Sequence, residues 1–227
     1  MRFGVVRFPG TNCDQDAVHA LRYMGYTADY VWHQDSSLKN FDAVVLPGGF
    51  SYGDYLRSGA IARFSPIMSE IVRFAKAGHP VIGICNGFQV LTEAHLLPGA
   101  LIRNKKLKFL CQTVHLSVQD SSCQWLNVEQ GRVLDIPISH HDGNYVCSKQ
   151  EYQSMLENKQ IVLRYCEADG KILPDSAPNG SFDNIAGICN KEGNVFGLMP
   201  HPERVVDGVA HNTQGQAFFE SIIKQIG

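Results

Sequence analysis

Several features that mark other protein classes are missing from this sequence. Its 227 residues carry a net charge of only -2, so it has no basic excess of the kind that nucleic-acid-binding proteins use. The seven cysteines include no C-x-x-C pair, which argues against a zinc knuckle and against a disulfide framework. The first residues lack the apolar core of a signal peptide, and no apolar run is long enough to span a bilayer. We therefore expect a soluble, cytoplasmic protein with no nucleic-acid or membrane partner.

Cofactor signatures are also missing. The turn after the first predicted strand has no G-x-G-x-x-G, and its Asp14 and Asp16 place negative charge where a phosphate would bind. The sequence contains no G-x-x-x-x-G-K-[ST] loop either. His140, His141 and Asp142 look like a metal site, but nothing else supplies further ligands at metal-binding spacing. We expect no metal and no cofactor in this chain.

The elements that are present alternate regularly in the first hundred residues. Apolar runs predict strands at 2–8, 26–32, 41–46 and 79–84, and helical periodicity predicts helices within 12–25, 66–78 and 86–97. That order is typical of a parallel sheet covered by helices. We predict an α/β fold with a mostly parallel, doubly wound sheet and flanking helices.

The second half of the chain has a different pattern. Strands are predicted at 109–116, 132–138 and 161–165, a short helix at 149–159, a hairpin over 185–199, and a terminal helix bearing Phe218, Phe219, Ile222, Ile223 and Ile226. We expect a smaller antiparallel β section there. No linker or repeat separates the halves, so we predict a single domain over residues 1–227.

The central motif is found at residues 79–89, HPVIGICNGFQ. A short apolar strand runs into Gly-Ile-Cys-Asn-Gly and then into a helix, which is the cysteine version of the G-x-S-x-G nucleophile elbow. A thiol at this turn lies at a helix N-terminus, where the backbone dipoles favour the thiolate. Cys85 is therefore the candidate nucleophile. The alternative is that Cys85 is buried packing, as free cysteines often are.

A second motif, PGGF at residues 47–50, follows the strand that precedes the elbow unit. Two glycines after a parallel strand can direct backbone N–H groups toward a ligand, and a pair of such donors forms an oxyanion hole. An ordinary tight turn is the alternative interpretation. The carboxyl ends of parallel strands share one edge of the sheet, so this turn and Cys85 are expected to meet.

A third motif, PHPE at residues 200–203, ends the last predicted strand. In an extended segment His201 and Glu203 project to the same side, so the carboxylate can orient the imidazole. A histidine that titrates near neutral pH can take a proton from a thiol and return it to a leaving amine. Taken alone, a surface histidine is the simpler interpretation. The three motifs together favour a Cys-His-Glu triad.

In this order the three motifs resemble the class I (triad) glutamine amidotransferases. The resemblance implies that Cys85 attacks the side-chain amide of L-glutamine, His201 moves the protons and Glu203 orients His201. It also implies that the N–H groups of Gly49 and Asn86 form the oxyanion hole. The residues expected to bind the rest of the substrate are Gly48, Phe50, Gln89, Gly143 and Asn144. Where the family more often has glutamate, this chain has Asp142, which leaves any substrate contact of that side chain open.

Within that family, residues 9–14 (PGTNCD), 48–57 (GGFSYGDYLR) and 85–89 (CNGFQ) resemble stand-alone glutaminase subunits of purine biosynthesis. The resemblance implies that ammonia passes to a separate synthetase subunit, which uses ATP and Mg to convert formylglycinamide ribonucleotide to its amidine. A small bridging subunit is expected in the complex. The basic cluster of Arg103, Lys105, Lys106 and Lys108 is either a docking patch or a solvated surface.

Three alternatives stay open from the sequence. One is a glutaminase that serves another synthetase, and the second is a cysteine hydrolase of the DJ-1/PfpI type. His201 and Glu203 weigh against the second, since those hydrolases usually lack the His-Pro-Glu ending. The third is a regulator that docks on a synthetase without chemistry of its own, against which the intact Cys85, His201 and Glu203 argue.

Overall fold

The structure is a computed structural model that describes residues 1–126 and 128–220. The first half of the chain forms β1 (Arg2–Arg7), α1 (Asp14–Tyr23), β2 (Thr27–Trp32), β3 (Ala43–Leu46), α2 (Pro66–Lys76), β4 (Val81–Ile84) and α3 (Asn86–Glu93). The second half forms β5 (Ala100–Ile102), β6 (Leu110–Val118), β7 (Val133–His140), β8 (Asn144–Val146), α4 (Lys149–Glu157), β9 (Ile161–Cys166), β10 (Ile185–Cys189), β11 (Val195–Leu198) and α5 (Ala217–Glu220).

One large sheet organises the described residues. Its nine strands lie in the order β2-β1-β3-β4-β11-β10-β9-β6-β7. The strands from β2 to β11 in this order are mutually parallel, and those from β11 to β7 pair antiparallel. The predicted α/β class is confirmed, and the antiparallel section extends the parallel sheet from one edge. A separate two-stranded ribbon joins β5 to β8.

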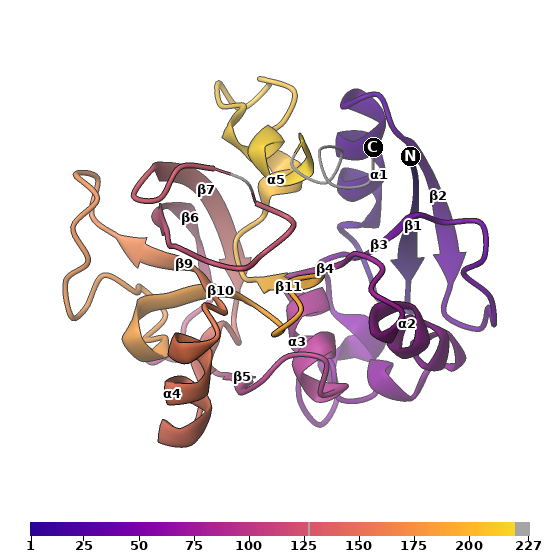
Figure 1. The fold of residues 1–227 in the computed structure, drawn as a ribbon, viewed down its shortest axis with the longest axis horizontal. Helices are drawn as coiled ribbons and strands as arrows, with labels where there is room; N and C mark the ends of the chain where they lie inside the picture. Colours follow the sequence, from indigo (N-terminus) through magenta and orange to yellow (C-terminus); the bar gives the residue numbers. More distant parts are fainter. Residues whose placement is uncertain (127, 221–227) are drawn as a thin grey trace.

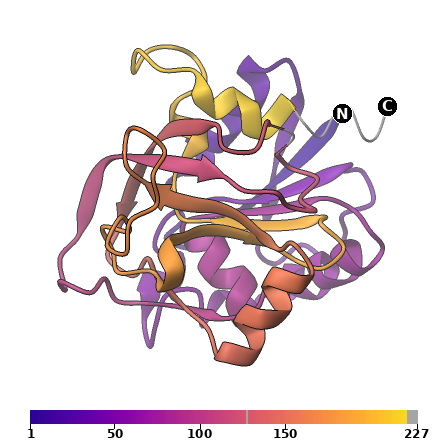
Figure 2. The ribbon, with the colours of Figure 1, turned by 60° about the vertical axis from the view of Figure 1, so that its left-hand side comes forward.

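Helices cover both faces of the sheet (Figures 1 and 2). Helices α1 and α5 lie on one face, and α2 and α3 lie on the other. This arrangement follows from right-handed crossovers that run in opposite directions from β1 and from β3. The order reverses between β1 and β3, and the crevice beyond the carboxyl ends of strands at such a point is where α/β sheets bind ligands.

The parallel strands are buried on both faces. Every residue of β3 and β4 is buried, because helices cover both sides of these strands. The edge strand β2 is only partly buried, with Ala28 and Val31 buried and Tyr30 and Trp32 exposed. Burial therefore explains why the central strands read as continuous apolar runs in the sequence.

The predicted terminal helix lies partly outside the described residues. The structure describes α5, which buries Phe218 and Phe219, whereas Ile222, Ile223 and Ile226 lie outside the described part. For the same reason the prediction of one domain over residues 1–227 stays a prediction. Within 1–126 and 128–220, no helix combines the length and apolar character that a membrane crossing requires.

Candidate active site

Two adjacent strands position the predicted nucleophile and the predicted base. Strand β4 ends at Ile84, which pairs with Leu198 of the parallel strand β11. Cys85 follows directly and donates its backbone N–H to the Leu198 carbonyl at 2.8 Å. His201 follows β11 by three residues, so the thiol and the imidazole emerge from the same edge of the sheet.

The turn at Cys85 is the sharp elbow that the sequence predicts. Cys85 has a φ of 51° and a ψ of -105°, a backbone conformation that L-residues rarely adopt. Gly83 and Gly87, two positions before and after Cys85, let the turn pack closely against β3 and α3. A Cβ on Gly87 would lie 1.9 Å from the Leu46 carbonyl oxygen, and one on Gly83 would lie 2.6 Å from the backbone of Gly87. Side chains at these positions would force α3 away from the sheet.

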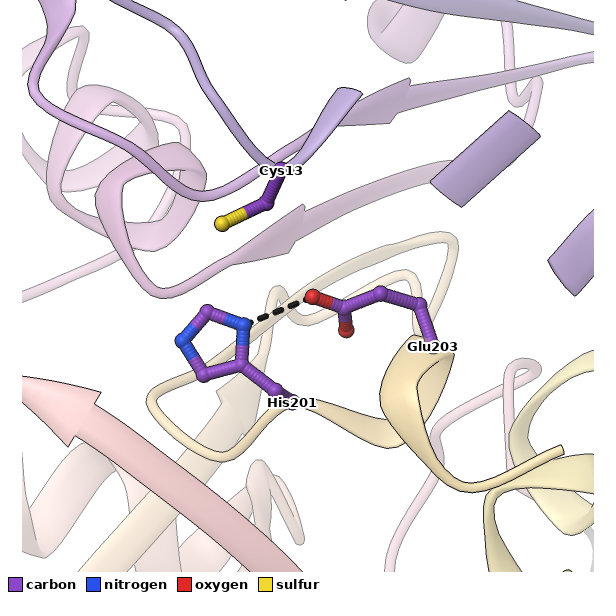
Figure 3. A group of neighbouring side chains, drawn as sticks. All are labelled: Cys13, His201 and Glu203. Carbon is purple, nitrogen blue, oxygen red and sulfur yellow. Dashed lines mark hydrogen bonds and ion pairs between the residues drawn. The ribbon is translucent and has the colours of Figure 1, made fainter. Parts of the chain in front are cut away.

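His201 and Glu203 form a hydrogen bond, which Figure 3 shows, and both residues are buried. The Nδ1 atom of His201 lies 2.6 Å from Oε1 of Glu203, and the two residues are 1% and 3% exposed. Pro202 between them begins a short 3-10 turn, which holds both side chains on one side of the segment. The Glu203 carboxylate accepts a hydrogen bond from the Nδ1–H group of His201, so Nε2 is the ring nitrogen that remains to exchange a proton with a substrate.

The charges around His201 favour its protonated form. Burial alone would lower its pKa, but the negative charge of Glu203 and the neighbouring Cys85 outweigh burial and raise the pKa of His201 to about 10. The imidazole is therefore positively charged at neutral pH. Within the described residues Nε2 has no hydrogen-bond partner, which leaves it available to a substrate.

The thiol and the imidazole lie side by side above Gly48. A Cβ on Gly48 would lie 2.8 Å from Cε1 of His201 and 3.4 Å from Cβ of Cys85. Only glycine leaves room for both side chains at this point. The Cys85 sulfur lies 3.7 Å from the Ser139 carbonyl oxygen, at the end of β7.

Gly49 and Asn86 carry the backbone N–H groups that were predicted to form the oxyanion hole. Gly49 has a φ of +143°, and a Cβ there would lie 2.7 Å from the Asn12 nitrogen, so glycine is required. Asn86 is the first residue of α3, and N–H groups of a first helical turn have no acceptor within the helix. The side chain of Asn86 accepts from the Ser51 N–H at 3.0 Å and donates to Asp54 at 3.1 Å. This clamp ties α3 to the loop that follows the Gly-Gly turn.

A cavity of about 320 Å³ opens beside these groups. Cys85, Gly49 and His201 line it together with Phe50 and Gln89, so the structure brings these five predicted residues around one space. The Gln89 side chain is already held at both ends, since Oε1 accepts from Asn86 at 2.8 Å and Nε2 donates to the Asp142 carbonyl at 2.6 Å. It therefore also joins α3 to the turn after β7.

Gly143 and Asn144 follow the turn after β7, and Asn144 begins β8. Gly143 donates its N–H to Asn104 at 3.0 Å, and its carbonyl accepts from Asn179 at 2.8 Å. Neither Gly143 nor Asn144 is among the residues that line the cavity. Their predicted contact with the substrate stays a prediction. The Asp142 side chain does line the cavity and accepts from Ser58 at 2.9 Å.

The structure adds two residues that the sequence interpretation missed. Cys13 follows β1 and lies on the cavity wall with only 4% of its surface exposed. Arg204, the last residue of the short 3-10 turn after His201, donates to the Cys13 sulfur at 3.1 Å. Burial and the charge of Glu203 raise the pKa of Cys13 to about 12, so this thiol stays protonated. The signal for Cys13 in the sequence was its position beyond the carboxyl end of a parallel strand.

Cys13, His201 and Glu203 are also close enough to be considered as metal ligands (Figure 3). One donor atom from each lies within 4.8 Å of the others. However, Nδ1 of His201 is bonded to Glu203, and the Arg204 guanidinium lies against the Cys13 sulfur. A cation at this point would meet the positive charge of Arg204 and would break the His201–Glu203 pair. The residues therefore do not fit a metal ion.

Comparisons with known proteins identify the family. A family model described as a CobB/CobQ-like glutamine amidotransferase domain matches residues 1–224. The chain belongs to this glutamine amidotransferase family. The family assignment confirms the class that the Gly-Gly, cysteine and His-Pro-Glu motifs indicated.

Similar proteins narrow the assignment within the glutamine amidotransferases. The chain is 51% identical to the phosphoribosylformylglycinamidine synthase subunit PurQ of Moorella thermoacetica, over 98% of this chain and 95% of that protein. It is 50% identical to the subunit PurQ of Salinibacter ruber, over 99% of this chain and 97% of that protein. Among solved structures, that of PurLQS from Thermotoga maritima matches with a TM-score of 0.88 and 42% identity, covering 100% of this chain and 99% of the other.

Proposed function

We propose that this chain is the glutaminase subunit of a phosphoribosylformylglycinamidine synthase. The observation that supports the proposal most is that Cys85 and His201 line one cavity beside the Gly-Gly turn, with Glu203 hydrogen-bonded to His201 behind it. Its likeness to PurQ subunits over nearly its whole length supports the assignment to this synthase. The substrate is L-glutamine, and the products are glutamate and ammonia.

In the first half of the proposed reaction, the Cys85 thiolate attacks the carbon of the glutamine side-chain amide. The oxygen of the tetrahedral intermediate accepts hydrogen bonds from the N–H groups of Gly49 and Asn86. Each such donor is worth on the order of 3–4 kcal/mol of the barrier. The His201 imidazolium gives its Nε2 proton to the amide nitrogen, the C–N bond breaks, and ammonia leaves behind a thioester on Cys85.

In the second half, neutral His201 accepts a proton from water, and the hydroxyl oxygen attacks the thioester carbon. The C–S bond then breaks, which releases glutamate and restores the thiolate and the imidazolium. Glu203 keeps the Nδ1–H tautomer and stabilises the imidazolium whenever it forms. Atoms balance: glutamine and water give glutamate and ammonia.

We assign the second reaction to the partner subunits. Ammonia released into water becomes protonated and loses its nucleophilic lone pair, so the proposal requires direct transfer to a synthetase subunit. That subunit uses ATP and Mg to form the amidine of formylglycinamide ribonucleotide, and a small bridging subunit completes the complex. Support comes from the PurLQS structure, whose PurQ-like chain matches this one along its length. We place the complex in the cytoplasm, since all seven cysteines, each within the described residues, are free thiols.

Replacing the nucleophile tests this division of labour. Cys85→Ala is expected to abolish glutamine-dependent amidine synthesis by the complex, because no thioester can form. Ammonium salts are expected to support synthesis at the wild-type rate, because the synthetase site is unchanged. The measurement is amidine formation by the reconstituted complex with each nitrogen source.

The exposed Cys111 on β6 supplies the matched control. Cys111→Ala should retain both glutamine-dependent and ammonium-dependent synthesis. Retained glutamine use by Cys85→Ala would contradict the catalytic assignment. Loss of ammonium-dependent synthesis in Cys85→Ala, with the complex still assembled, would contradict the division between subunits.

A further inference from the structure

His140 is a second buried histidine in the cavity that the proposed reaction does not use. It ends β7 next to Ser139, whose carbonyl faces the Cys85 sulfur, and it is among the residues that line the same cavity. Only 3% of its surface is exposed. Burial and the positive charge of His201 both lower the pKa of His140, so the two rings interact electrostatically.

Asn104 fixes the proton on the His140 ring. The Asn104 amide nitrogen donates to the carbonyls of Lys108 at 2.9 Å and of His140 at 3.0 Å. Carbonyls only accept, so this end of the amide must be the NH₂ group. The Asn104 oxygen then accepts from the Gly143 N–H at 3.0 Å and lies 3.1 Å from Nδ1 of His140. Nδ1 must therefore carry the hydrogen.

The other ring nitrogen is consequently an acceptor without a donor. With its proton on Nδ1, a neutral imidazole presents only a lone pair at Nε2. Within the described residues no donor reaches Nε2 of His140, although the atom is buried. Burial, together with the charge of His201, lowers the pKa of His140 to about 4, so the ring stays neutral at physiological pH. A buried acceptor without a partner is costly unless a ligand supplies the donor.

We propose that His140 Nε2 accepts a hydrogen bond from the NH₂ group of the glutamine side chain and thereby selects glutamine over glutamate. The inference rests on the proposed function. When the amide oxygen points to Gly49 and Asn86, the NH₂ hydrogens need acceptors on the opposite side. His140 supplies one of them from the end of β7, and Asn104 acts through His140 as a positioning residue.

The same arrangement disfavours the product. Glutamate carries an ionised oxygen in place of the NH₂ group, so the two lone pairs would face each other with no hydrogen between them. His140 cannot remove this repulsion between lone pairs by taking up a proton near neutral pH, because burial disfavours its charged form. Sites built to hydrogen-bond one group reject an analogue that lacks it much more strongly than apolar pockets reject a change of size.

Two substitutions separate recognition from a structural role. In His140→Asn the amide nitrogen takes the place of Nδ1 and keeps the bond to Asn104, but nothing replaces Nε2. In His140→Gln the longer amide reaches the Nε2 position and offers its oxygen as the acceptor. The glutamine KM and the glutamate Ki are measured for glutaminase activity in the complex with the synthetase.

For His140→Asn we expect the glutamine KM to rise about tenfold, the loss expected when a buried polar group goes unpaired, while the glutamate Ki falls because the opposing lone pair is gone. His140→Gln should recover part of the loss. A wild-type ratio of KM to Ki in His140→Asn would overturn the proposal, and so would an equal rise of both constants. Absence of glutaminase activity in the wild-type complex would instead refute the proposed function.

A measurement on the ring itself does not depend on how the His140 variants fold. The ¹⁵N spectrum of His140 in the full chain should show the neutral Nδ1–H tautomer between pH 6 and 8. In Cys85→Ala, which cannot turn glutamine over, saturating glutamine should shift the Nε2 resonance and glutamate should not. A charged ring, the opposite tautomer or an unmoved resonance with glutamine bound would overturn the proposal.

Discussion

The charge of His201 is set by two neighbours within the buried site. Burial opposes a charged imidazole, yet the carboxylate of Glu203 and the neighbouring Cys85 together raise the pKa of His201 and hold the ring protonated. His140, which has no carboxylate on either ring nitrogen, is held neutral by the same burial. Two histidines of one cavity therefore differ in charge because their partners differ.

Replacing Glu203 by glutamine should move the pH range of the glutaminase. The largest contribution that raises the pKa of His201 comes from Glu203, so Glu203→Gln lowers that pKa. The imidazolium proton needed by departing ammonia is then lost at a lower pH. We expect the alkaline limb of kcat, near pH 10 in the wild type, to move toward neutral pH, and kcat to fall on the order of 10³-fold to 10⁴-fold.

Glu203→Asp is the control for this shift, because it keeps the negative charge while it shortens the side chain. Its alkaline limb should lie closer to that of the wild type than the limb of Glu203→Gln does. The measurement is glutamine hydrolysis by the complex between pH 6 and 11. An alkaline limb at the same pH in all three proteins would show that Glu203 does not govern the titration of His201.

At the scale of elements, the fit of α3 against the sheet holds the nucleophile in its strained turn. Gly87 approaches the Leu46 carbonyl from the first turn of α3, and Gly197 of β11 lets Phe88 pack directly on the strand, since a Cβ there would lie 2.2 Å from that ring. Phe88 in turn stacks on Tyr145 of β8, with ring centroids 6.0 Å apart. The elbow is thus held by packing on both sides.

Gly87→Ala tests this contact with little interference from the backbone. Alanine is favoured over glycine inside a helix by about 1 kcal/mol, so any destabilisation must come from the overlap with Leu46. We expect the free energy of unfolding to fall by about 2 kcal/mol or more, as in other overpacked sites. Glutaminase activity should fall with it, because α3 carries Asn86 and positions Cys85. Urea unfolding and ammonia release are the measurements.

Gly25→Ala provides a comparison at a position with open space. Its φ of +86° makes alanine strained, but apart from its chain neighbours no atom of the described residues lies within 4 Å of the added carbon. We expect a loss of about 1–2 kcal/mol from backbone strain alone and unchanged glutaminase kinetics. A Gly87→Ala protein that is as stable and active as the wild type would contradict the packing argument.

Much of the site could be predicted because its residues follow strands. Gly48, Cys85 and His201 each come after an apolar run, and parallel strands bring such residues to one edge of the sheet. Cys13 was missed even though it follows β1, since it lacks the glycines two positions away on each side that mark Cys85, and such a cysteine resembles ordinary packing. The acceptor role proposed for His140 was also out of reach, because it depends on Asn104, a residue far along the chain with no local signal.

The order of the strands in the sheet could not be predicted from the sequence, for a different reason. Apolar runs identify strands but do not say which ones pair, and strand β11 reaches β4 from more than a hundred residues along the chain. The antiparallel strands likewise gave no sign that they continue the parallel sheet. The pairing depends on how the helices pack across the sheet, which is a property of the whole molecule.

At the scale of the whole molecule, the activity of the free subunit should be low. The proposed function needs ammonia to be passed to a synthetase, so hydrolysis without that partner wastes glutamine. We expect the chain alone to release ammonia at least about tenfold more slowly than in the complex, consistent with conformational steps that gate many enzymes. The measurement is glutamine hydrolysis with and without the synthetase and its substrate.

Cys85→Ala with the synthetase gives the background of that assay. If the free chain and the complex hydrolyse glutamine at the same rate above this background, the partner does not control the glutaminase. If the synthetase stimulates glutamine hydrolysis before its own substrate is added, then docking of the two subunits is enough to activate the glutaminase.

The direct pairing of β4 with β11 has a consequence for engineering. Because adjacent strands of a sheet keep a spacing of about 4.8 Å, the sulfur and the imidazole are held in place by neighbouring strands whatever lies between them in the chain. The exposed turn at residues 167–171 after β9 does not line the cavity, so it can be lengthened or exchanged while the reacting atoms keep their separation. This turn is therefore the place to graft a tether or a new contact for a different ammonia acceptor.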